Sequence, residues 1–413
     1  MLRTELLEIV TNGENSGVEF KRDDIRPEQL AKEVVALANL RGGMILLGVE
    51  DDGTISGIQR ENLEEWVMDT VFARYIHPLI LPFYEVILME DGKKVAIISF
   101  PQGTSKPYVL RHNDREDIFI RLGTTSRIAT REQQARLFES GCILHSELIP
   151  VPGTSLQSLD LERIRNYLQY FVKDPDIPES NGEWEKRLIT LGFLVEVRSD
   201  LIVCTIAGLV LFGLSPRRYL KQAGIRLIVY SSDDKTYHAE YDEIIDGPMV
   251  SRYFLDEDGS LKIIDPGIID RFSEILIPYI SQDEDELIDS FQRKKIWHYP
   301  LDAIRETVVN ALCHRDWTRF IDIEVNRFID RVEVISPGTL PNSMNIEKMI
   351  AGQRSPRNNL IVDTLRDYGY VDSKGMGVKK KVIPLMKLHN QTDPIFSVTD
   401  DYVKTILYRK QGL

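Results

Sequence analysis

The chain has 413 residues, of which 43% are hydrophobic and 28% charged, which is typical of a soluble globular protein of two to four domains. A formal net charge of −13 argues against a protein that coats nucleic acid, so nucleic acid would have to meet a local basic patch. Three cysteines without Cys-x-x-Cys spacing predict neither a disulfide framework nor a structural zinc site. With no signal-peptide pattern and no run long enough to span a membrane, the sequence predicts a cytoplasmic protein that binds no membrane.

The first predicted elements are two strands near the start of the chain. The segment Val18–Lys21 alternates as a strand does, so the side chains of Glu19 and Lys21 share one face. Residues 43–49 are largely apolar and predict a buried strand, which begins after a pair of glycines and ends in an acidic turn at residues 50–53. These glycine and aspartate positions also fit ordinary turns, and that structural interpretation stays open.

We expect these strands to deliver three carboxylates to one edge, those of Glu14, Glu19 and Asp51. Neighbouring carboxylates repel one another unless a cation neutralises them, and carboxylate oxygens suit Mg²⁺ or Mn²⁺. The cluster therefore predicts a divalent-metal site, beside which Lys21 would stabilise negative charge that develops on a phosphodiester.

The two segments resemble the Schlafen core, also called the AlbA-like type 2 domain. Its pattern Glu-Ser-x-x-x-Glu-Phe-Lys is matched from Glu14, with Asn15 in place of Ser, and Gly-Val-Asp-Asp-x-Gly is matched from Gly48, with Glu50 in place of the first Asp. The resemblance implies an α+β domain over residues 1–148 that binds nucleic acid. In members that cleave RNA, the catalytic and metal-binding positions correspond to Glu14, Glu19 and Asp51, and Lys21 is also present.

A later part of the same family pattern, Lys-Pro-Tyr followed by Arg-x-Gly-x-x-Thr/Ser-Arg, is also present. Arginines that flank small hydroxyl residues and a glycine suit contacts to phosphate oxygens, although Arg121 also fits an ordinary surface cation. The nucleic-acid contacts that we expect are Lys21, Lys106, Arg121, Thr125 and Arg127.

The middle of the chain predicts a connector. Proline and glycine at residues 149–153 mark a linker, and Asp160 is placed to cap the following helix. Residues 184–213 predict a helix, a short strand pair and an apolar helix, which is similar to a small winged helix that related bacterial proteins carry at this place. Because these helices lack base-reaching polar groups, we interpret residues 154–218 as a structural connector rather than a DNA-reading domain.

The C-terminal part predicts strands over residues 223–245, one or two amphipathic helices over 263–291, and a later helix with a polar face. On that later helix Glu306, Asn310 and His314 are four residues apart, so they point the same way. A carboxylate can orient a water molecule, and a carboxamide oxygen can ligate Mg²⁺. We therefore predict a nucleotide site, with Glu306 as catalytic residue and Asn310 as magnesium ligand.

Three further motifs follow in order, which are Ser336-Pro337-Gly338, Arg357-Asn358 and Lys374-Gly375-Met376-Gly377. The order resembles the Bergerat-type (GHKL) ATPases, and most of all the bacterial branch described as RecG-related ATP-binding proteins. The resemblance implies an α/β sandwich over residues 219–413 that binds ATP with Mg²⁺. The cofactor-binding residues that we expect are Glu306, Asn310, His314, Arg315, Ser336, Gly338, Lys374, Gly375 and Gly377.

One departure from that family concerns the adenine contact. Well-studied members have an Asp where this chain has Ser336, and that Asp accepts a hydrogen bond from the adenine amino group. A hydroxyl accepts such a bond without charge assistance, so the sequence predicts a weaker and less selective adenine contact.

The sequence as a whole predicts a multidomain α+β protein that binds ATP and acts on nucleic acid. The N-terminal domain would bind and cleave RNA, tRNA included, under control of the C-terminal ATP site, in a homodimer or higher homo-oligomer. Such an architecture fits phage defence, with metal-dependent endoribonuclease or weak ATPase activity. Two alternatives stay open: a non-catalytic, ATP-responsive DNA-binding transcriptional regulator, and an interaction protein whose two sites have decayed.

Overall fold

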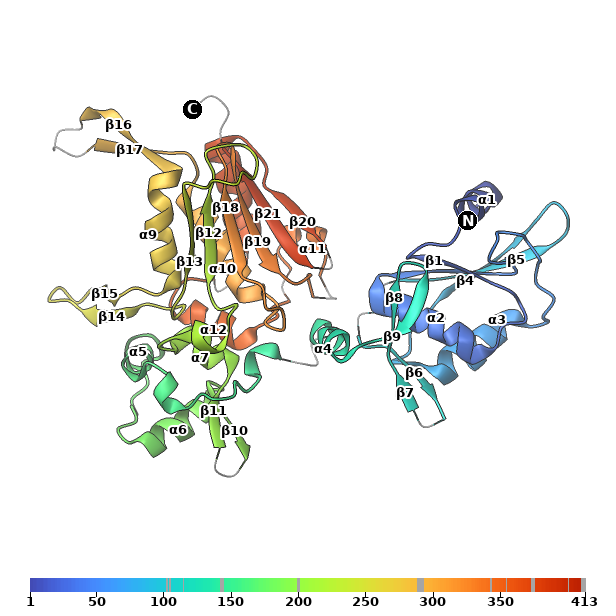
Figure 1. Cartoon of the computed structure of the whole chain (residues 1–413), viewed down its shortest axis with the longest axis horizontal. Helices are drawn as coiled ribbons and strands as arrows, with labels where there is room; N and C mark the ends of the chain where they lie inside the picture. Colours follow the sequence, from blue (N-terminus) through green and yellow to red (C-terminus); the bar gives the residue numbers. More distant parts are fainter. Residues whose placement is uncertain are drawn as a thin grey trace. The chain divides into compact units, whose positions relative to one another are not determined.

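The computed structural model describes residues 1–101, 103, 105–113, 115–141, 145–198, 201–287, 293–341, 344–353, 355–372, 376–399 and 401–409. The chain divides into two compact units, residues 1–144 and residues 145–413 (Figure 1). Helices and strands are mixed in both units, and the α+β class predicted from the sequence is confirmed.

The N-terminal unit is built on a four-stranded sheet of order β1-β2-β5-β4, whose strands are β1 (Val18–Lys21), β2 (Gly42–Leu47), β4 (Phe83–Leu88) and β5 (Lys94–Pro101). Strands β1 and β2 are parallel because α2 (Pro27–Leu40) carries the chain back between them. Apolar residues on α2 recur at helical spacing and are fully buried, as at Leu30, Val34 and Leu37. The sheet and this helix therefore hold the N-terminal motifs on a packed core.

Smaller elements surround that core. The helices are α1 (Arg3–Asn12), α3 (Leu63–Glu65), continued by π-helical turns over Trp66–Ala73, and α4 (Arg131–Ser140). The short strands are β3 (Ile76–His77), β6 (Val109–His112), β7 (Arg115–Asp117), β8 (Phe119–Leu122) and β9 (Thr125–Ile128). Strands β8 and β9 form a hairpin, which places residues 119–128 beside α2.

The C-terminal unit is a two-layer sandwich with a six-stranded sheet of order β13-β12-β18-β19-β21-β20. Its strands are β12 (Ile225–Val229), β13 (Tyr241–Ile245), β18 (Ile323–Arg327), β19 (Arg331–Pro337), β20 (Ile395–Val398) and β21 (Tyr402–Tyr408). Along β19, Val332, Val334 and Ser336 are buried toward the helices, whereas alternate residues such as Glu333 pair with Lys404 on the other face. One face of the sheet therefore carries the core, and the opposite face carries ion pairs.

The helices of this unit include α9 (Ile268–Ile280), α10 (Leu301–His314), α11 (Ile346–Ala351), α12 (Asn359–Asp367) and α13 (Ile383–Asn390), the last preceded by π-helical turns over Val378–Val382. Two hairpins extend from the sandwich, β14 (Arg252–Leu255) with β15 (Leu261–Asp265), and β16 (Ser281–Leu287) with β17 (Arg293–Trp297). In the described part of residues 263–291 the structure has one helix, α9, because Ser281 and the residues after it pair with β17 instead of continuing α9. None of the described helices has both the length and the apolarity that a membrane crossing requires.

The expected connector shares its core with the sandwich. It comprises α5 (Leu161–Asn166), continued by π-helical turns over Tyr167–Val172, α6 (Asn181–Thr190), β10 (Leu194–Arg198), β11 (Leu201–Cys204), α7 (Ile206–Phe212) and α8 (Pro216–Tyr219). Asp160 caps α5 as predicted, since its carboxylate accepts from the backbone N–H of Arg163 at 3.0 Å. Every residue of α7 is buried, and one hydrophobic core runs from Val151 to Leu407. A fully buried helix cannot enter a DNA groove, so the structural interpretation of this segment agrees with its packing.

Candidate functional sites

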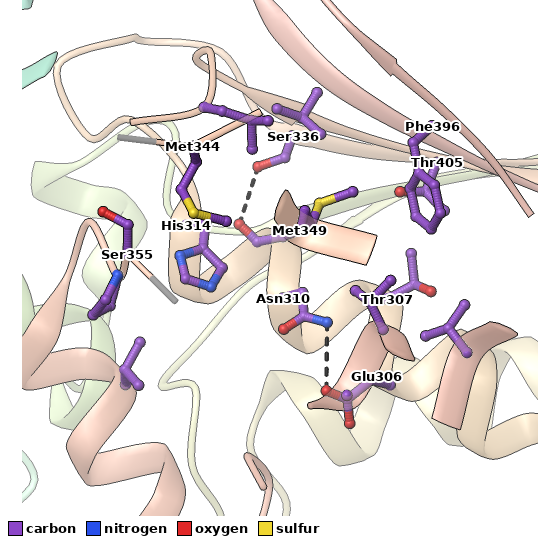
Figure 2. A pocket seen from close by; sticks show the side chains of 18 of the residues that line it. Glu306, Thr307, Asn310, His314, Ser336, Met344, Met349, Ser355, Phe396 and Thr405 are labelled. Atoms are coloured by element: carbon purple, nitrogen blue, oxygen red, sulfur yellow. Dashed lines mark hydrogen bonds between the residues drawn. The ribbon is translucent and has the colours of Figure 1, made fainter. Parts of the chain in front are cut away.

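A cavity of about 200 Å³ lies along one face of α10 (Figure 2). Glu306, Asn310 and His314 line it together, as the spacing of four predicts. The facing wall comes from elements far apart in the sequence and is mostly apolar. It includes Val334, Leu340, Met344, Met349, Val378, Phe396 and Val403. One side of the cavity is thus a short polar row, formed by Glu306, Asn310 and His314, and the opposite side is a broad apolar surface.

The polar row is held by contacts within the site. The Asn310 amide donates to Glu306 Oε1 at 3.4 Å, and Lys381 Nζ lies 3.4 Å from Glu306 Oε2. Gly377 passes so close to the Glu306 carboxylate that a Cβ at this position would collide with it. Glu306 is therefore covered by the segment that carries Gly377, and the glycine is needed for that close approach.

The predicted residue Ser336 also faces the cavity, beside His314 of the polar row. His314 lies where burial, and then the charge of Arg357, lowers its pKa to about 4, so its imidazole is neutral at pH 7. The Ser336 hydroxyl donates to the backbone carbonyl of Ala311 at 3.1 Å, which ties β19 to α10. The oxygen of Ser336 keeps acceptor capacity toward the cavity, which it lines.

The structure corrects the prediction for Arg315. Its side chain is fully buried and does not line the cavity. It donates to the carbonyls of Gln222 at 2.7 Å and Ile321 at 2.9 Å, and its guanidinium lies 4.2 Å from the Trp317 ring. The prediction of a nucleotide contact at Arg315 is wrong, because this charge closes the backbone turn after α10.

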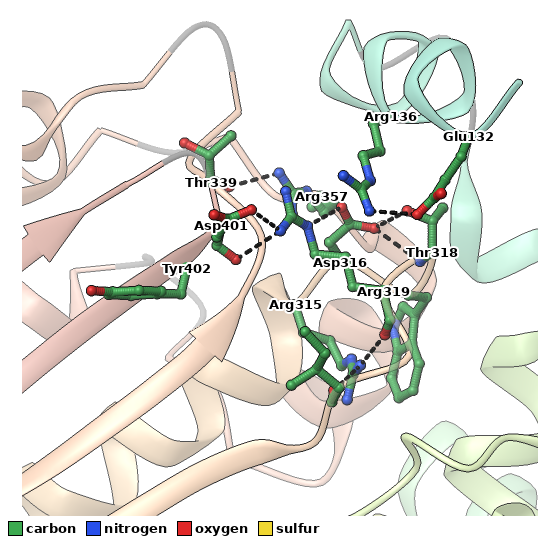
Figure 3. A network of polar contacts seen from close by, with 12 residues as sticks. Glu132, Arg136, Arg315, Asp316, Thr318, Arg319, Thr339, Arg357, Asp401 and Tyr402 are labelled. Carbon is green, nitrogen blue, oxygen red and sulfur yellow. Dashed lines mark hydrogen bonds and ion pairs between the residues drawn. The ribbon is translucent and has the colours of Figure 1, made fainter. Parts of the chain in front are cut away.

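Gly338 has a conformational role in place of the predicted nucleotide contact. It adopts a φ of +104°, and a Cβ there would meet Arg357 and Asp316. Figure 3 shows the surrounding network, in which Arg319 joins Asp316 at 3.3 Å and Asp401 at 2.8 Å. The network fixes the turn at the rim of the cavity without lining it. Lys374 and Gly375 lie outside the described residues.

The N-terminal motifs meet at the ammonium of Lys21. Its Nζ lies 2.5 Å from Glu19 Oε1, 3.8 Å from Glu14 Oε1 and 3.9 Å from Asp51 Oδ1. Burial by itself lowers the pKa of Lys21, but the hydrogen bond and charge of Glu19, with Glu14 and Asp51, raise it overall. Burial also raises the pKa of Glu14, against the backbone N–H of Phe20. The structure thus brings the three predicted acids together.

A second cation lies behind the cluster. Arg121 has no exposed side-chain surface; it pairs with Glu19, contacts Glu33 at 3.1 Å and donates to the Asn15 carbonyl at 3.1 Å. Ser126 also donates to Glu33, at 2.5 Å. The prediction of Arg121 as a phosphate contact is wrong, because the guanidinium is buried among carboxylates. Sequence reasoning missed Glu33, whose position on α2 gives no sign of a partner 88 residues away.

The predicted metal does not fit this arrangement. Within the described part of the chain, no group of three His, Cys, Asp or Glu side chains is placed to hold a metal ion. The ammonium of Lys21 lies beside all three carboxylates, and the guanidinium of Arg121 forms an ion pair with Glu19. The cluster is therefore largely neutralised by the chain itself, and we derive no metal-dependent step through it.

The other predicted nucleic-acid contacts differ in exposure. Lys106 is buried and donates to the Leu40 carbonyl at 2.8 Å, so its prediction as a phosphate contact is also wrong. Thr125 and Arg127 are exposed on β9. Between them Ser126 turns inward to Glu33, so the exposed side of β9 is fixed next to the acidic cluster.

Comparisons with known proteins agree with both resemblances. Residues 14–130 match the family model "Schlafen, AlbA_2", and residues 321–407 match the model "Putative ATP-dependent DNA helicase recG C-terminal". The second match begins after α10, so the assignment of Glu306, Asn310 and His314 depends on the geometry of the cavity. No curated protein matches the chain.

Two solved structures are similar in part. One is the DIP2311 protein from Corynebacterium diphtheriae, with 20% identity, 98% of this chain and 80% of the other covered, and a TM-score of 0.44. The other is the N-terminal domain of a "Putative ATP-dependent DNA Helicase RecG-related Protein" from Nitrosomonas europaea, with 22% identity, 31% and 92% covered, and a TM-score of 0.24. We draw no functional conclusion from either.

The chain therefore carries a Schlafen, AlbA_2 domain in its N-terminal unit and a RecG-related ATPase-like domain in its C-terminal unit. Together the two domains indicate a nucleic-acid-related, ATP-binding protein.

Proposed function

We propose that the α10 cavity binds ATP with Mg²⁺ and that the N-terminal domain binds RNA, tRNA included, under control of that site. The observation that supports this most is the shared face of α10, where Glu306, Asn310 and His314 border a cavity with an apolar wall opposite. A purine ring suits the apolar wall, and the carboxylate and carboxamide oxygens suit Mg²⁺. Bound Mg²⁺ would neutralise phosphate charge.

The chain's own residues have distinct roles in this proposal. Asn310 would hold the Mg²⁺ ion, Glu306 would orient a water molecule, and neutral His314 would hydrogen-bond to the ligand without adding charge. The cavity of about 200 Å³ is smaller than the roughly 300 Å³ at which ligand sites begin. In this proposal ATP enters when the segment at Gly377, which covers the Glu306 carboxylate, moves away from it. Ser336 in place of Asp makes discrimination between ATP and GTP modest.

Thermal unfolding with ATP and Mg²⁺ tests the nucleotide site. A ligand at 100 times its Kd stabilises the folded state by about 2.7 kcal/mol, which shifts the C-terminal transition upward. Asn310→Ala should abolish this shift, while Asn181→Ala, at the exposed start of α6, should keep it. An equal shift in Asn310→Ala would remove the magnesium assignment.

RNA binding is proposed at the exposed side of β9. Arg127→Ala should weaken binding of labelled tRNA and lower its salt dependence, because one phosphate contact is lost. Arg3→Ala, at the start of α1, is the matched control with an exposed arginine. Preference for duplex DNA over RNA would replace this part of the proposal by a DNA-binding regulator.

Cleavage of the bound RNA is favoured by one observation, the meeting of three carboxylates from separate segments at Lys21. Glu14, whose pKa is raised by burial, would transfer the proton that cleavage requires. Lys21 would stabilise the negative charge that develops on the phosphodiester. Labelled tRNA incubated with Mg²⁺, with Mn²⁺ or with a chelator tests this, using Glu14→Gln as the variant. Intact tRNA in all three conditions would reject cleavage, and plaque counts on a host that expresses the chain or this variant would test phage defence.

A further inference from the structure

The β14–β15 hairpin extends away from the sandwich of the C-terminal unit (Figure 1). Among the described strands, β14 and β15 pair only with each other, so no further strand covers either outer edge. A two-stranded hairpin with open edges is marginally stable in water unless another surface covers it. The hairpin is held at its root, where the Asn166 amide donates to the Tyr253 carbonyl at 2.5 Å and accepts from its N–H at 2.9 Å.

One face of the hairpin is an apolar stripe that leads out from the core. Tyr253 opposes Ile263 and Leu255 opposes Leu261, so these four side chains share a face. At the root Tyr253 packs against Phe171, with ring centroids 5.2 Å apart. Further out, Leu255, Leu261 and Ile263 are 54%, 37% and 42% exposed. We call these three residues the hairpin stripe, and such a contiguous apolar surface marks an interaction site.

The two ends of the hairpin carry opposite charge. The tip holds Asp256, Glu257 and Asp258, and among the described residues the ion pair at the tip is the one between Lys262 and Asp256. At the root, Arg252 has a buried Nε without a hydrogen-bond partner. Its neighbour across the ladder, Asp265, pairs with Arg163 at 2.5 Å. The hairpin is therefore acidic at its tip, whereas its root carries the Arg252 cation beside the Arg163–Asp265 pair.

We infer that a second copy of this chain covers the hairpin stripe. Two hairpins related by a twofold axis lie antiparallel, so the stripes face each other and each acidic tip meets the Arg252 of the other copy. A twofold interface uses the same patch on both subunits, and a surface with opposite charges at its two ends is complementary to itself in this orientation. The acidic tip also opposes nucleic acid as the occupant.

Sedimentation equilibrium of the full chain without nucleotide tests this inference independently of ATP binding. The native chain should dimerise, and Leu255→Asp should raise the dimer dissociation constant roughly 30-fold, as expected when a buried interface anchor is lost. Phe254→Asp, on the opposite face of the same strand, is the matched control and should leave the dimer intact. Unchanged thermal unfolding would show that each variant is folded.

A charge exchange tests the antiparallel orientation. Arg252→Glu should weaken the dimer at least about tenfold, because like charges then face each other. Adding Glu257→Arg and Asp258→Arg to the same chain should restore it. A monomeric native chain, a dimer that survives Leu255→Asp, a failed restoration, or binding only to a different protein would each overturn the inference.

Discussion

The two candidate sites handle charge in opposite ways. In the N-terminal cluster, Lys21 neutralises the carboxylates of Glu14, Glu19 and Asp51. Arg121 is fully buried and pairs with Glu19. In the α10 cavity a short polar row faces a wide apolar wall, and Lys381, the cation that pairs with Glu306, is 45% exposed. The first site therefore depends on mutual neutralisation, whereas the second depends on its shape and on the segment at Gly377 that covers Glu306.

The largest effect should come from removing the buried cation of the N-terminal cluster. Arg121→Met removes a buried cation from the carboxylates of Glu19 and Glu33, which should cost about 3–5 kcal/mol. Urea unfolding of the N-terminal transition measures this loss, with Arg127→Met as the exposed control, for which about 0.5 kcal/mol or less is expected. Similar losses in the two variants would mean that the cluster does not depend on neutralisation.

The stability of the C-terminal unit should depend on pH through two buried histidines. Burial lowers the pKa of both His314 and His298 to about 4 from 6.5, so between these values the unfolded chain binds protons that the folded chain excludes. Stability should be complete above pH 6.5 and fall as pH falls toward 4, by up to about 3 kcal/mol for each histidine. His314→Gln and His298→Gln should each remove part of the slope. A slope unchanged in both variants contradicts the assignment.

A smaller loss of stability is expected when a side chain is added at Gly377, in the segment that covers Glu306. In Gly377→Ala the new methyl group meets the Glu306 carboxylate, and such overpacking costs about 1–3 kcal/mol. Gly182→Ala in α6 is the matched control, because a Cβ there meets nothing within 4 Å and should stabilise by less than about 1 kcal/mol. Calorimetry of both variants measures the difference. If Gly377→Ala were as harmless as Gly182→Ala, the cover would not lie on Glu306.

The smallest effect should come from the exposed ion pair of the cavity. Lys381→Met removes a half-exposed partner of Glu306 and should change stability by less than about 1 kcal/mol. Lys21→Met, by contrast, leaves three carboxylates around an empty centre and should cost more. Parallel melts of the two Lys→Met variants compare the sites directly. Equal costs would remove the distinction between them.

Features that depend on local backbone geometry could be predicted from the sequence. Helical spacing placed Glu306, Asn310 and His314 on one face, strand alternation placed Glu19 beside Lys21, and motif order indicated both domains. These features follow from periods of 3.6 and 2 residues, which are properties of the backbone.

Which charges are buried with a partner, and which surfaces remain exposed, depends on the packing of segments far apart in the sequence. Arg121, Lys106 and Arg315 look like phosphate ligands in the sequence, yet burial directs them to carboxylates and carbonyls far along the chain. The cover at Gly377 and the far wall of the cavity likewise come from non-local packing. A buried charge must find a partner wherever the fold provides one, and no spacing along the chain records that choice.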